Sequence, residues 1–471
     1  MLNYKKNIIL MVFIIFIFFF SFSQVSAEEN SLHNNISINN NSSIQKTINN
    51  SLENGIIILE PGLYSESGII IDKNITIMGN SSRENIIIDG NYSNNIFIIK
   101  SNRAYVNFIN ITFINGRVDG HGGAIHSEAG NVFVDNCAFI NNTASVNGGA
   151  IDNYGTETAG YLFVNNSLFI GNYAGHDGGA ITTYRGNTDI YNSIFVNNHA
   201  KRDGGAIRGE IYTNTNIYNC SFDNNYADEW GGALYIWTSN STIQNSTFTN
   251  NNAGTYGGAI FTSAKTIVKD SIFFNNSAEF GGLIYIVQKL EAIPLNIIFN
   301  NNLIINNSAA HGDDVYMGNA IYVEYSASNI INFENNDWGT DNPEWEKRFF
   351  TNNFTNFPKN WIKTVKDILN PSNNTTPYQE KINQTNNPIF KPLSDIFNFI
   401  TQNYLNENIN IVSNNTNSKS VGFDSLKAQK QNSYELNINK EAKKIYNNDF
   451  IKYLIIFVLI VVLIVIGYKR F

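Results

Sequence analysis

Positive charge and cysteine are both scarce in this chain. Only 15% of its 471 residues are charged, the formal net charge is −8, and Lys and Arg form no dense patch. A protein that binds nucleic acid needs a basic footprint to neutralise phosphates. We therefore expect no nucleic acid among the partners of this protein.

The two ends of the chain carry long apolar runs. Residues 1–27 combine a basic start, an apolar core and a small-residue cleavage site, which is typical of a secretory signal peptide; the alternative is an uncleaved anchor. Residues 453–468 predict a short transmembrane helix, followed by Lys469 and Arg470. We expect a single-pass membrane protein at the cell surface, with an extracellular body and a short cytoplasmic C-terminus.

Between these ends a phrase such as GGAI recurs seven times. Its Gly pairs start at positions 122, 148, 178, 204, 231, 257 and 281, so the spacing is 26, 30, 26, 27, 26 and 24 residues. A second phrase, N-[SC]-x-F-x-x-N-x-A, aligns six phenylalanines at Phe139, Phe169, Phe195, Phe222, Phe248 and Phe273. An alternating stretch before each Phe predicts a strand, with an inward Val or Ile five residues before the Phe. The period is too short for two helices and fits one coil of a parallel β-helix.

The repeat assigns a role to each shared position. We expect the Gly pair to form a tight corner, the Phe residues to stack inside, and the Asn three residues after each Phe to form a hydrogen-bonded ladder at a left-handed turn. Residues 43–55 place Ile44, Ile48 and Leu52 at helical spacing after a Ser cap, which predicts a helix that closes the N-terminal end of the core. About eleven coils at about 4.8 Å each give a rod on the order of 50 Å long.

The domain prediction follows from these segments. A β-helix with its N-terminal cap occupies residues 28–342, and residues 343–370 pack on or near it. Residues 371–450 are rich in Asn, Ser and Thr and predict a flexible stalk. N-x-[ST] sequons such as those at Asn74 and Asn245 are candidate glycosylation sites, although most are chance matches in so Asn-rich a chain.

The paired GGAI and FxxN phrases resemble the repeats of chlamydial polymorphic outer-membrane proteins and of the archaeal adhesin-like proteins that share them. The opening "IQKTINN…IILEPGLYSE…NITIMG" is similar to the start of pectin-lyase-like right-handed β-helices. The resemblance covers about residues 43–340 and implies an all-β, right-handed parallel β-helix with a role in adhesion. The chlamydial proteins end in a membrane β-barrel, whereas this chain ends in one apolar segment, which matches the archaeal type of anchoring.

The two cysteines are predicted to be free thiols. Cys137 and Cys220 each lie two residues before a ladder Phe, and these Phe residues are three coils apart. Their separation of about 14 Å exceeds the roughly 7 Å limit between Cα atoms of a disulfide.

One cluster of charged residues is a candidate site. Asp177 and Asp203 precede successive Gly pairs, with His176, His199, Lys201 and Arg202 nearby. The pair is a weak candidate for Ca²⁺, and catalysis by it is less favoured; otherwise we expect no metal, no cofactor and no catalytic residue. The alternative is that these residues are solvated polar groups at solenoid turns.

Aromatic residues form the candidate ligand-binding site. Trp230, Tyr256 and Phe280 precede three successive Gly pairs, and Tyr235, Phe261 and Tyr285 follow the same GGAI phrases on the outward side of the strand. They predict a platform for sugar rings or for an apolar patch of a protein partner. The alternative is a covered face, packed under residues 286–296 or against residues 343–370.

The sequence therefore favours a non-enzymatic, membrane-anchored adhesin that attaches to glycans or to proteins of partner cells. A polysaccharide lyase or hydrolase of the β-helix type is the first alternative, and a structural component of a wall or sheath is the second.

Overall fold

The computed structural model describes residues 35–360, except for 101–103, 129, 156–159, 212, 289–294, 320–329, 341 and 352–357. The chain divides into two units, Met1–Lys366 and Asp367–Phe471, and all described residues lie in the first. The predicted signal peptide, stalk and transmembrane segment lie outside the described residues. Within the described part, no helix is long and apolar enough to span a membrane.

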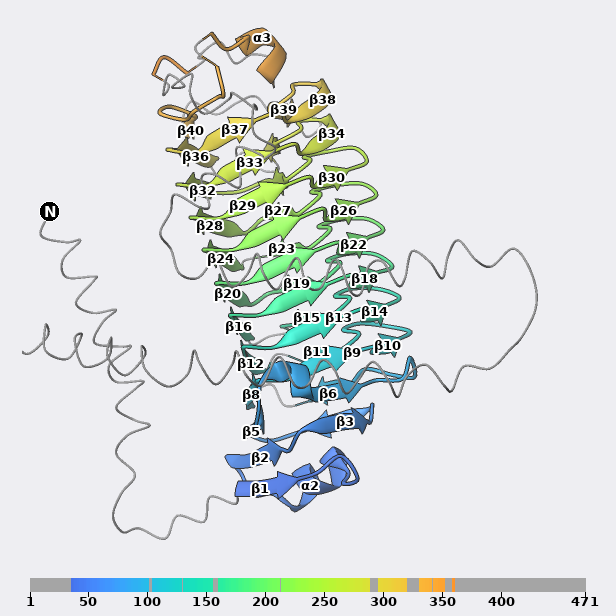
Figure 1. The fold of residues 1–471 in the computed structure, drawn as a ribbon. Helices are drawn as coiled ribbons and strands as arrows, with labels where there is room; N and C mark the ends of the chain where they lie inside the picture. Colours follow the sequence, from blue (N-terminus) through green and yellow to red (C-terminus); the bar gives the residue numbers. More distant parts are fainter. Residues whose placement is uncertain are drawn as a thin grey trace, which may run out of the picture. The chain divides into compact units, whose positions relative to one another are not determined.

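Four parallel sheets, named A to D here, run along the stacked coils (Figure 1). Sheet A consists of β1 (Asn35–Ile38), β2 (Gly55–Leu59), β5 (Ile75–Gly79), β8 (Tyr105–Ile109), β12 (Asn131–Asp135), β16 (Tyr161–Asn165), β20 (Asn187–Tyr191), β24 (Asn214–Tyr218), β28 (Asn240–Gln244), β32 (Thr266–Lys269), β36 (Asn296–Asn300) and β40 (Ile330–Asn332). Sheet B consists of β3 (Gly62–Ser65), β6 (Ile86–Asp89), β9 (Thr112–Ile114), β13 (Ala138–Ile140), β17 (Leu168–Ile170), β21 (Ile194–Val196), β25 (Ser221–Asp223), β29 (Thr247–Thr249), β33 (Ile272–Phe274) and β37 (Leu303–Ile305).

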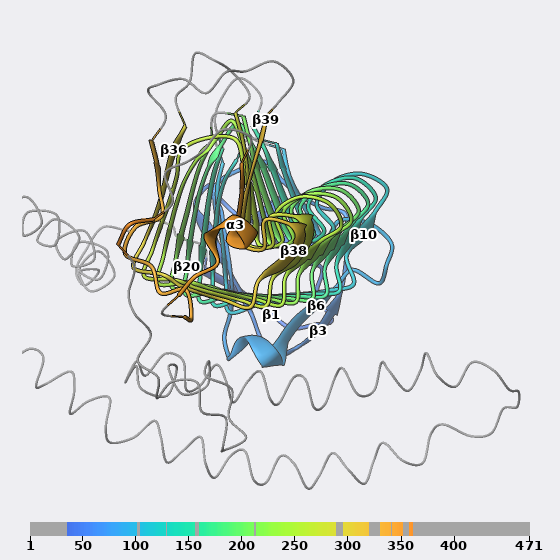
Figure 2. The same ribbon diagram turned by 90° about the horizontal axis from the view of Figure 1, so that it is seen from above.

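Sheets C and D complete each coil. Sheet C consists of β4 (Ile69–Ile71), β7 (Phe97–Ile99), β11 (Ile125–Glu128), β15 (Ile151–Tyr154), β19 (Ile181–Tyr184), β23 (Ile207–Glu210), β27 (Leu234–Trp237), β31 (Ile260–Thr262), β35 (Ile284–Gln288), β39 (Val315–Asn319) and β41 (Phe349–Thr351). Sheet D consists of β10 (Arg117–Val118), β14 (Thr143–Ala144), β18 (Tyr173–Ala174), β22 (His199–Ala200), β26 (Tyr226–Ala227), β30 (Asn252–Ala253), β34 (Ser277–Phe280) and β38 (Ser308–His311). Viewed from above, sheet D forms a lobe beside the other three sheets (Figure 2).

The protein is therefore an all-β parallel solenoid, as the repeat predicts. Among the described residues, 8 coils carry a strand in every sheet, since sheet D has 8 strands while sheets A, B and C have 12, 10 and 11. The expected number of about eleven coils is not confirmed, because coils before β10 and after β38 lack one or more of the four strands.

Phenylalanines fill the solenoid along sheet B. Successive ladder rings from Phe113 to Phe273 stack at centroid distances of 4.6 to 4.8 Å with interplanar angles of at most 10°. All are fully buried, as are the inward Val and Ile residues of sheet A, for example Val134 and Ile190. The predicted Phe ladder and its register are confirmed, and these rings pack in one core together with the aliphatic residues of the other sheets.

The two glycines of each pair are needed for different structural reasons. The first Gly has a positive φ, 64° at Gly148, which a residue with a side chain rarely adopts. The second Gly has ordinary φ, but a Cβ at Gly149 would overlap the carbonyl oxygen of Gly179 in the next coil. One glycine therefore turns the chain, and the other lets neighbouring coils approach each other.

Buried asparagines form the predicted ladder. The amide of Asn172 donates to Oδ1 of Asn198 at 2.9 Å and to the carbonyl oxygen of Phe139 at 3.0 Å, and the pattern repeats from coil to coil. The left-handed residue is not the ladder Asn, however, but the residue before it, such as Asn197 with φ 55°. The prediction placed that turn one residue too late, because adjacent asparagines share the two tasks.

The N-terminal helix is present as α2 (Ile44–Asn50), and the side chain of Ser43 accepts a hydrogen bond from the Lys46 amide. Ile44 and Ile48 are buried in the main core. Leu52 was expected to point inward, but it lies beyond the helix and is 44% exposed. The short helix η1 (Arg83–Asn85) connects β5 of sheet A to β6 of sheet B.

The C-terminal flank joins the solenoid. Strand β41 lies beyond the expected end of the β-helix at residue 342, yet it pairs with β39 in sheet C. Helix α3 (Trp345–Arg348) precedes it, and Trp345 packs against the main core beside Phe349. Residues 361–370 of the predicted flank lie outside the described part.

Both cysteines are buried and free, as predicted. Strands β17 and β21 separate their coils, because Phe139, Phe169, Phe195 and Phe222 pair in that order. Desolvation raises the pKa of each thiol to about 12, so Cys137 and Cys220 stay protonated and unreactive.

Candidate functional site

Two columns of side chains meet on the outer face of sheet C. The "outer column" holds the residue after each GGAI phrase, and the "turn column" holds the residue before each Gly pair. Along the solenoid the outer column is His126, Asp152, Thr182, Arg208, Tyr235, Phe261 and Tyr285. The turn column is His121, Asn147, Asp177, Asp203, Trp230, Tyr256, Phe280 and His311. We call the two columns together the sheet-C face.

The six predicted ligand-binding residues form one aromatic cluster on this face. Tyr235 and Phe261 stack at 5.0 Å, and Phe261 and Tyr285 stack at 5.4 Å. Trp230 lies over Phe261 at 5.3 Å with an interplanar angle of 14°. With Trp237 and Val287, these residues make a second hydrophobic cluster, separate from the main core.

The structure corrects which of the two trios faces solvent. Strand alternation points Tyr235, Phe261 and Tyr285 away from the main core, as expected, yet they are only 3%, 3% and 9% exposed. The large turn-column side chains of Trp230 and Tyr256 fold over them and are themselves half-buried. The second trio is therefore the floor of the cluster and not an exposed platform, because a bulky neighbour one column away covers it.

Asp177 and Asp203 belong to a buried ion-pair network. The Arg202 guanidinium donates to Oδ1 of Asp177 from Nε at 3.0 Å and to Oδ2 from Nη2 at 2.7 Å. In Arg208, which belongs to β23, Nη1 lies 3.2 Å from Oδ2 of Asp177 and Nη2 lies 2.5 Å from Oε2 of Glu210. The network also touches the aromatic cluster, because the Arg208 guanidinium lies over the Tyr235 ring at 5.6 Å.

This network argues against the Ca²⁺ candidate and against the solvated-turn alternative. Two guanidinium groups already neutralise Asp177, and Asp177 and Asp203 are 1% and 3% exposed. No group of three or more His, Cys, Asp or Glu residues within the described residues has the geometry of a metal site. Burial, followed by the charge of Asp177, raises the pKa of Asp203 to about 8, so this carboxyl is mostly protonated at neutral pH.

Of the other residues named beside this pair, only Arg202 joins it. His199 contacts Asp228 instead, with Nε2 and Oδ1 2.6 Å apart, and His176 is exposed. Arg208 was missed. The repeat could have predicted its place on this face, because Arg208 follows the fourth GGAI phrase, as Tyr235, Phe261 and Tyr285 follow the next three.

A histidine–carboxylate group at the N-terminal end of the same columns was also missed. Nδ1 of His126 lies 3.0 Å from Oδ2 of Asp152, and Nδ1 of His121 lies 3.9 Å from Oδ1. Desolvation lowers the pKa of His126, but its hydrogen bond to Asp152 and the charge of Asp152 outweigh that effect and raise the pKa above its usual value. The repeat register could have found this pair, since both residues follow GGAI phrases.

The repeats match a known family model. Residues 136–154, 192–210, 219–236 and 245–263 match the Chlamydia polymorphic membrane protein (Chlamydia_PMP) repeat. The predicted resemblance to chlamydial repeats is thereby confirmed for these four segments, each of which runs from an FxxN phrase into the following GGAI phrase. The archaeal part of the resemblance finds no support, and no curated protein matches the chain.

Solved structures share parts of the fold at low similarity. The catalytic domain of a GH87 α-1,3-glucanase is 12% identical, with a TM-score of 0.37 and coverage of 69% of each chain. A PL6 family polysaccharide lyase from Pseudopedobacter saltans is 14% identical, with a TM-score of 0.31 and coverage of 69% of this chain and 97% of that one. A PL6 family alginate lyase is 13% identical, with a TM-score of 0.30 and coverage of 70% of this chain and 53% of that one. At these TM-scores the likenesses support no statement about function.

Proposed function

We propose that this protein is a non-enzymatic, adhesin-like protein of the cell surface that binds glycans through the aromatic part of the sheet-C face. The observation that carries the proposal is the position of Trp230 and Tyr256, whose half-buried rings lie over a closely stacked aromatic floor. The match to a membrane-protein repeat supports placement at a surface. The N-terminal and C-terminal apolar segments of the sequence support export and anchoring.

The aromatic floor makes the upper rings a rigid platform. Because Tyr235 and Phe261 are buried beneath it, Trp230 cannot fold into the strand, and one of its faces is already stacked. A sugar ring presents a flat C–H face that stacks on such an indole, and little side-chain freedom is lost on binding. The neighbouring guanidinium of Arg202, which is 44% exposed, offers a hydrogen-bond donor to ligand hydroxyls or carboxylates.

One observation favours the enzymatic alternative. Asp203 is a carboxyl with a pKa of about 8 beside a second carboxyl, Asp177, and a protonated acid paired with a carboxylate is the usual equipment for cleaving glycosidic bonds. Both carboxyls are buried, however, and Asp177 is held by two arginines, so neither is placed to reach a bound chain. We therefore rank catalysis below binding.

The proposal is tested by comparing the full chain with Trp230→Ala and Tyr256→Ala variants on a glycan array and on whole cells. We expect each substitution to weaken binding about tenfold, because each removes one stacking face. Tyr154→Ala is the matched control, since Tyr154 is an exposed tyrosine that stacks on Tyr184 at 4.8 Å elsewhere on sheet C.

The other outcomes separate the alternatives. Equal binding by all variants would move the binding site off the sheet-C face. Absence of binding by the native chain would favour a structural wall component. Release of oligosaccharides from a polysaccharide by the native chain, and its loss in Asp203→Asn, would establish the enzyme.

A further inference from the structure

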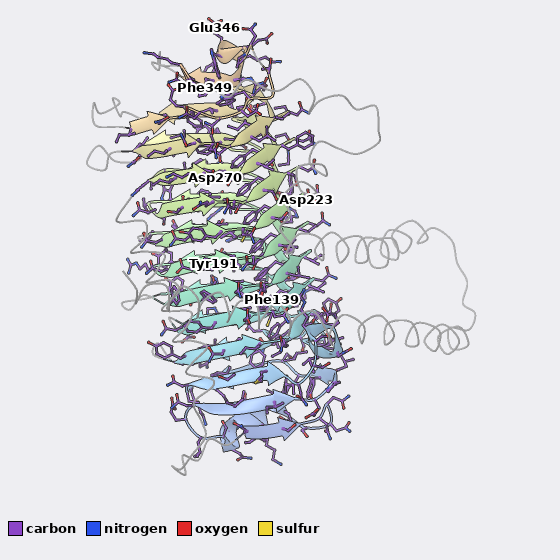
Figure 3. All side chains as sticks on the ribbon, turned by 60° about the vertical axis from the view of Figure 1, so that its left-hand side comes forward. Phe139, Tyr191, Asp223, Asp270, Glu346 and Phe349 are labelled. Atoms are coloured by element: carbon purple, nitrogen blue, oxygen red, sulfur yellow. The ribbon has the colours of Figure 1, made fainter. Side chains whose placement is uncertain are left out.

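A second row of aromatic residues lies on the outer face of sheet A. Its rings belong to five successive strands and run diagonally across them. We call this row the sheet-A strip; it consists of Tyr105, Phe133, Phe163, Tyr191 and Tyr218. Tyr191 is labelled in Figure 3, where Phe139 marks the core position on the neighbouring sheet.

The rings of the strip are continuous and accessible. Neighbouring centroids are 6.3, 6.1, 5.6 and 5.1 Å apart from the first ring to the last. Tyr105 is 54% exposed, and the other four rings are partly exposed, whereas the residues between them on each strand, such as Val134 and Val164, are fully buried. The strip therefore adds nothing to the solenoid core and covers about four strand spacings, on the order of 20 Å.

Polar groups border the strip, and those that carry charge are carboxylates. Asp189 accepts a hydrogen bond at 2.6 Å from the hydroxyl of Tyr161 and another at 2.8 Å from Asn216. Asp135 accepts one at 2.7 Å from Asn165. The outer positions of β8, β12, β16, β20 and β24, which are all described, contain no Lys or Arg.

We propose that the sheet-A strip is a docking surface for a linear polysaccharide whose sugars are uncharged or carry amino groups. The strip follows one diagonal line of rings, with the ring of Tyr161 beside it at 5.8 Å from Phe133, so it fits a chain that offers flat C–H faces in a line and hydroxyls at its edges. The asparagine amides and aspartate carboxylates beside the rings match those hydroxyls, and the two carboxylates attract amines and repel uronates or sulfates.

A folded protein partner fits this surface less well. A stable protein interface buries about 800 Å² on each side around a compact apolar centre, whereas the strip is narrow and has polar residues on both edges. Contiguous exposed apolar residues mark interaction surfaces, which supports a binding role for this row beside its cross-strand stacking. The strip belongs to sheet A and shares no residue with the sheet-C face, so variants can test the two surfaces separately.

The test uses the full chain with chitosan oligomers, a soluble linear glucan and polygalacturonate. We expect binding of the first two and not of the third. Phe163→Ala combined with Tyr191→Ala should weaken that binding at least about tenfold, while Tyr154→Ala, which removes an exposed tyrosine of sheet C outside both sites, leaves it unchanged. Asp135→Asn with Asp189→Asn should weaken chitosan more than the glucan. Equal melting curves for native and variant chains show that the fold is kept, as expected when only outward side chains change.

Several results would overturn the proposal. Polygalacturonate bound as tightly as chitosan would contradict the charge argument, and unchanged binding in the Phe163/Tyr191 variant would exclude the strip. Binding that appears only after proteolysis beyond residue 360 would identify the C-terminal part of the chain as the occupant of the strip. Loss of binding in Trp230→Ala alone would leave the sheet-C proposal standing and reject this one.

Discussion

The two halves of the sheet-C face share a backbone and differ in everything that the side chains do. From His121 to Arg208 the columns hold histidines, aspartates and an arginine, which form ion pairs with one another and with the adjoining Arg202 and Glu210. From Trp230 to Tyr285 the same positions hold aromatic rings joined by stacking. The Gly pairs, the Phe ladder and the Asn ladder beneath them continue unchanged from one half to the other.

The comparison teaches that the repeat fixes where a side chain points, while the residue at each variable position decides what that side chain does. A parallel stack places equivalent residues one strand spacing apart, so neighbours in a column always interact. Like charges in one column therefore need partners from outside it. Arg208 of the outer column and Arg202, which precedes Asp203 in the chain, supply them. Aromatic residues need no such partners and pack on one another.

The largest effect is expected in the aromatic half. Phe261→Ala removes the central ring of the buried floor and should lower the free energy of unfolding by about 3 to 5 kcal/mol. Phe261→Leu keeps most of the volume and should cost clearly less. Denaturant titration of both variants measures this, and equal losses would mean that volume at this position does not matter.

In the charged half, Asp177→Ala should lower the free energy of unfolding by about 3 kcal/mol, because the buried Arg208 loses one of its two carboxylate partners and keeps only Glu210. The loss falls at the low end for a broken buried pair, since Arg202 is 44% exposed and can turn to solvent. Arg202→Ala should therefore cost less than Arg208→Ala. The reverse order in thermal melts would contradict the assignment of the network.

Asp203 predicts how the charged half responds to pH. Its pKa of about 8 lies above the usual value, so the folded chain holds a proton that the unfolded chain releases. Stability should therefore fall as the pH rises from about 4 to about 8 and change no further above that range. In Asp203→Asn this fall should be smaller. Parallel melting-temperature curves for the two proteins between pH 5 and pH 8 would show that Asp203 is ionised in the folded state.

The smallest effect is expected at His126. Its raised pKa means that protonation stabilises the folded chain below about pH 6.5, and that this contribution is lost as the pH rises through the higher pKa of the folded state. His126→Gln should lower the melting temperature more at pH 5 than at pH 9. His176→Gln, at an exposed position two coils away, is the control and should change neither value.

The repeat was sufficient to predict the solenoid, and the Phe and Asn ladders show why. A period near 26 residues with shared Phe, Asn and Gly positions leaves one way to stack the coils, so register and burial follow from the sequence. The exposure of Tyr235 and Phe261 could not be predicted in the same way. It depends on how far the Trp230 and Tyr256 side chains reach over them. Alternation along one strand predicts only the direction in which a side chain points and not which neighbours cover it.

The pairing of Asp177 had the same limit. Its partner Arg208 is on the following coil and in the other column, so the contact depends on two columns facing each other. The sheet-A strip was missed for a simpler reason. Phe133 and Phe163 stand at outward positions of strands that were analysed only for their inward residues.

The most direct test of the account replaces Trp230 and Tyr256 with Asn, the residue that Asn147 provides at the equivalent position of another coil. One preparation of the native chain and one of the double variant are compared by thermal melting and by binding to the glycan that gives the strongest array signal. The account predicts a melting temperature lower by about 5 °C or less and binding weaker by at least about tenfold. Unfolding of the variant, or unchanged binding by a folded variant, would contradict the separation between a scaffold made by the repeats and a ligand-binding face made by the positions where they differ.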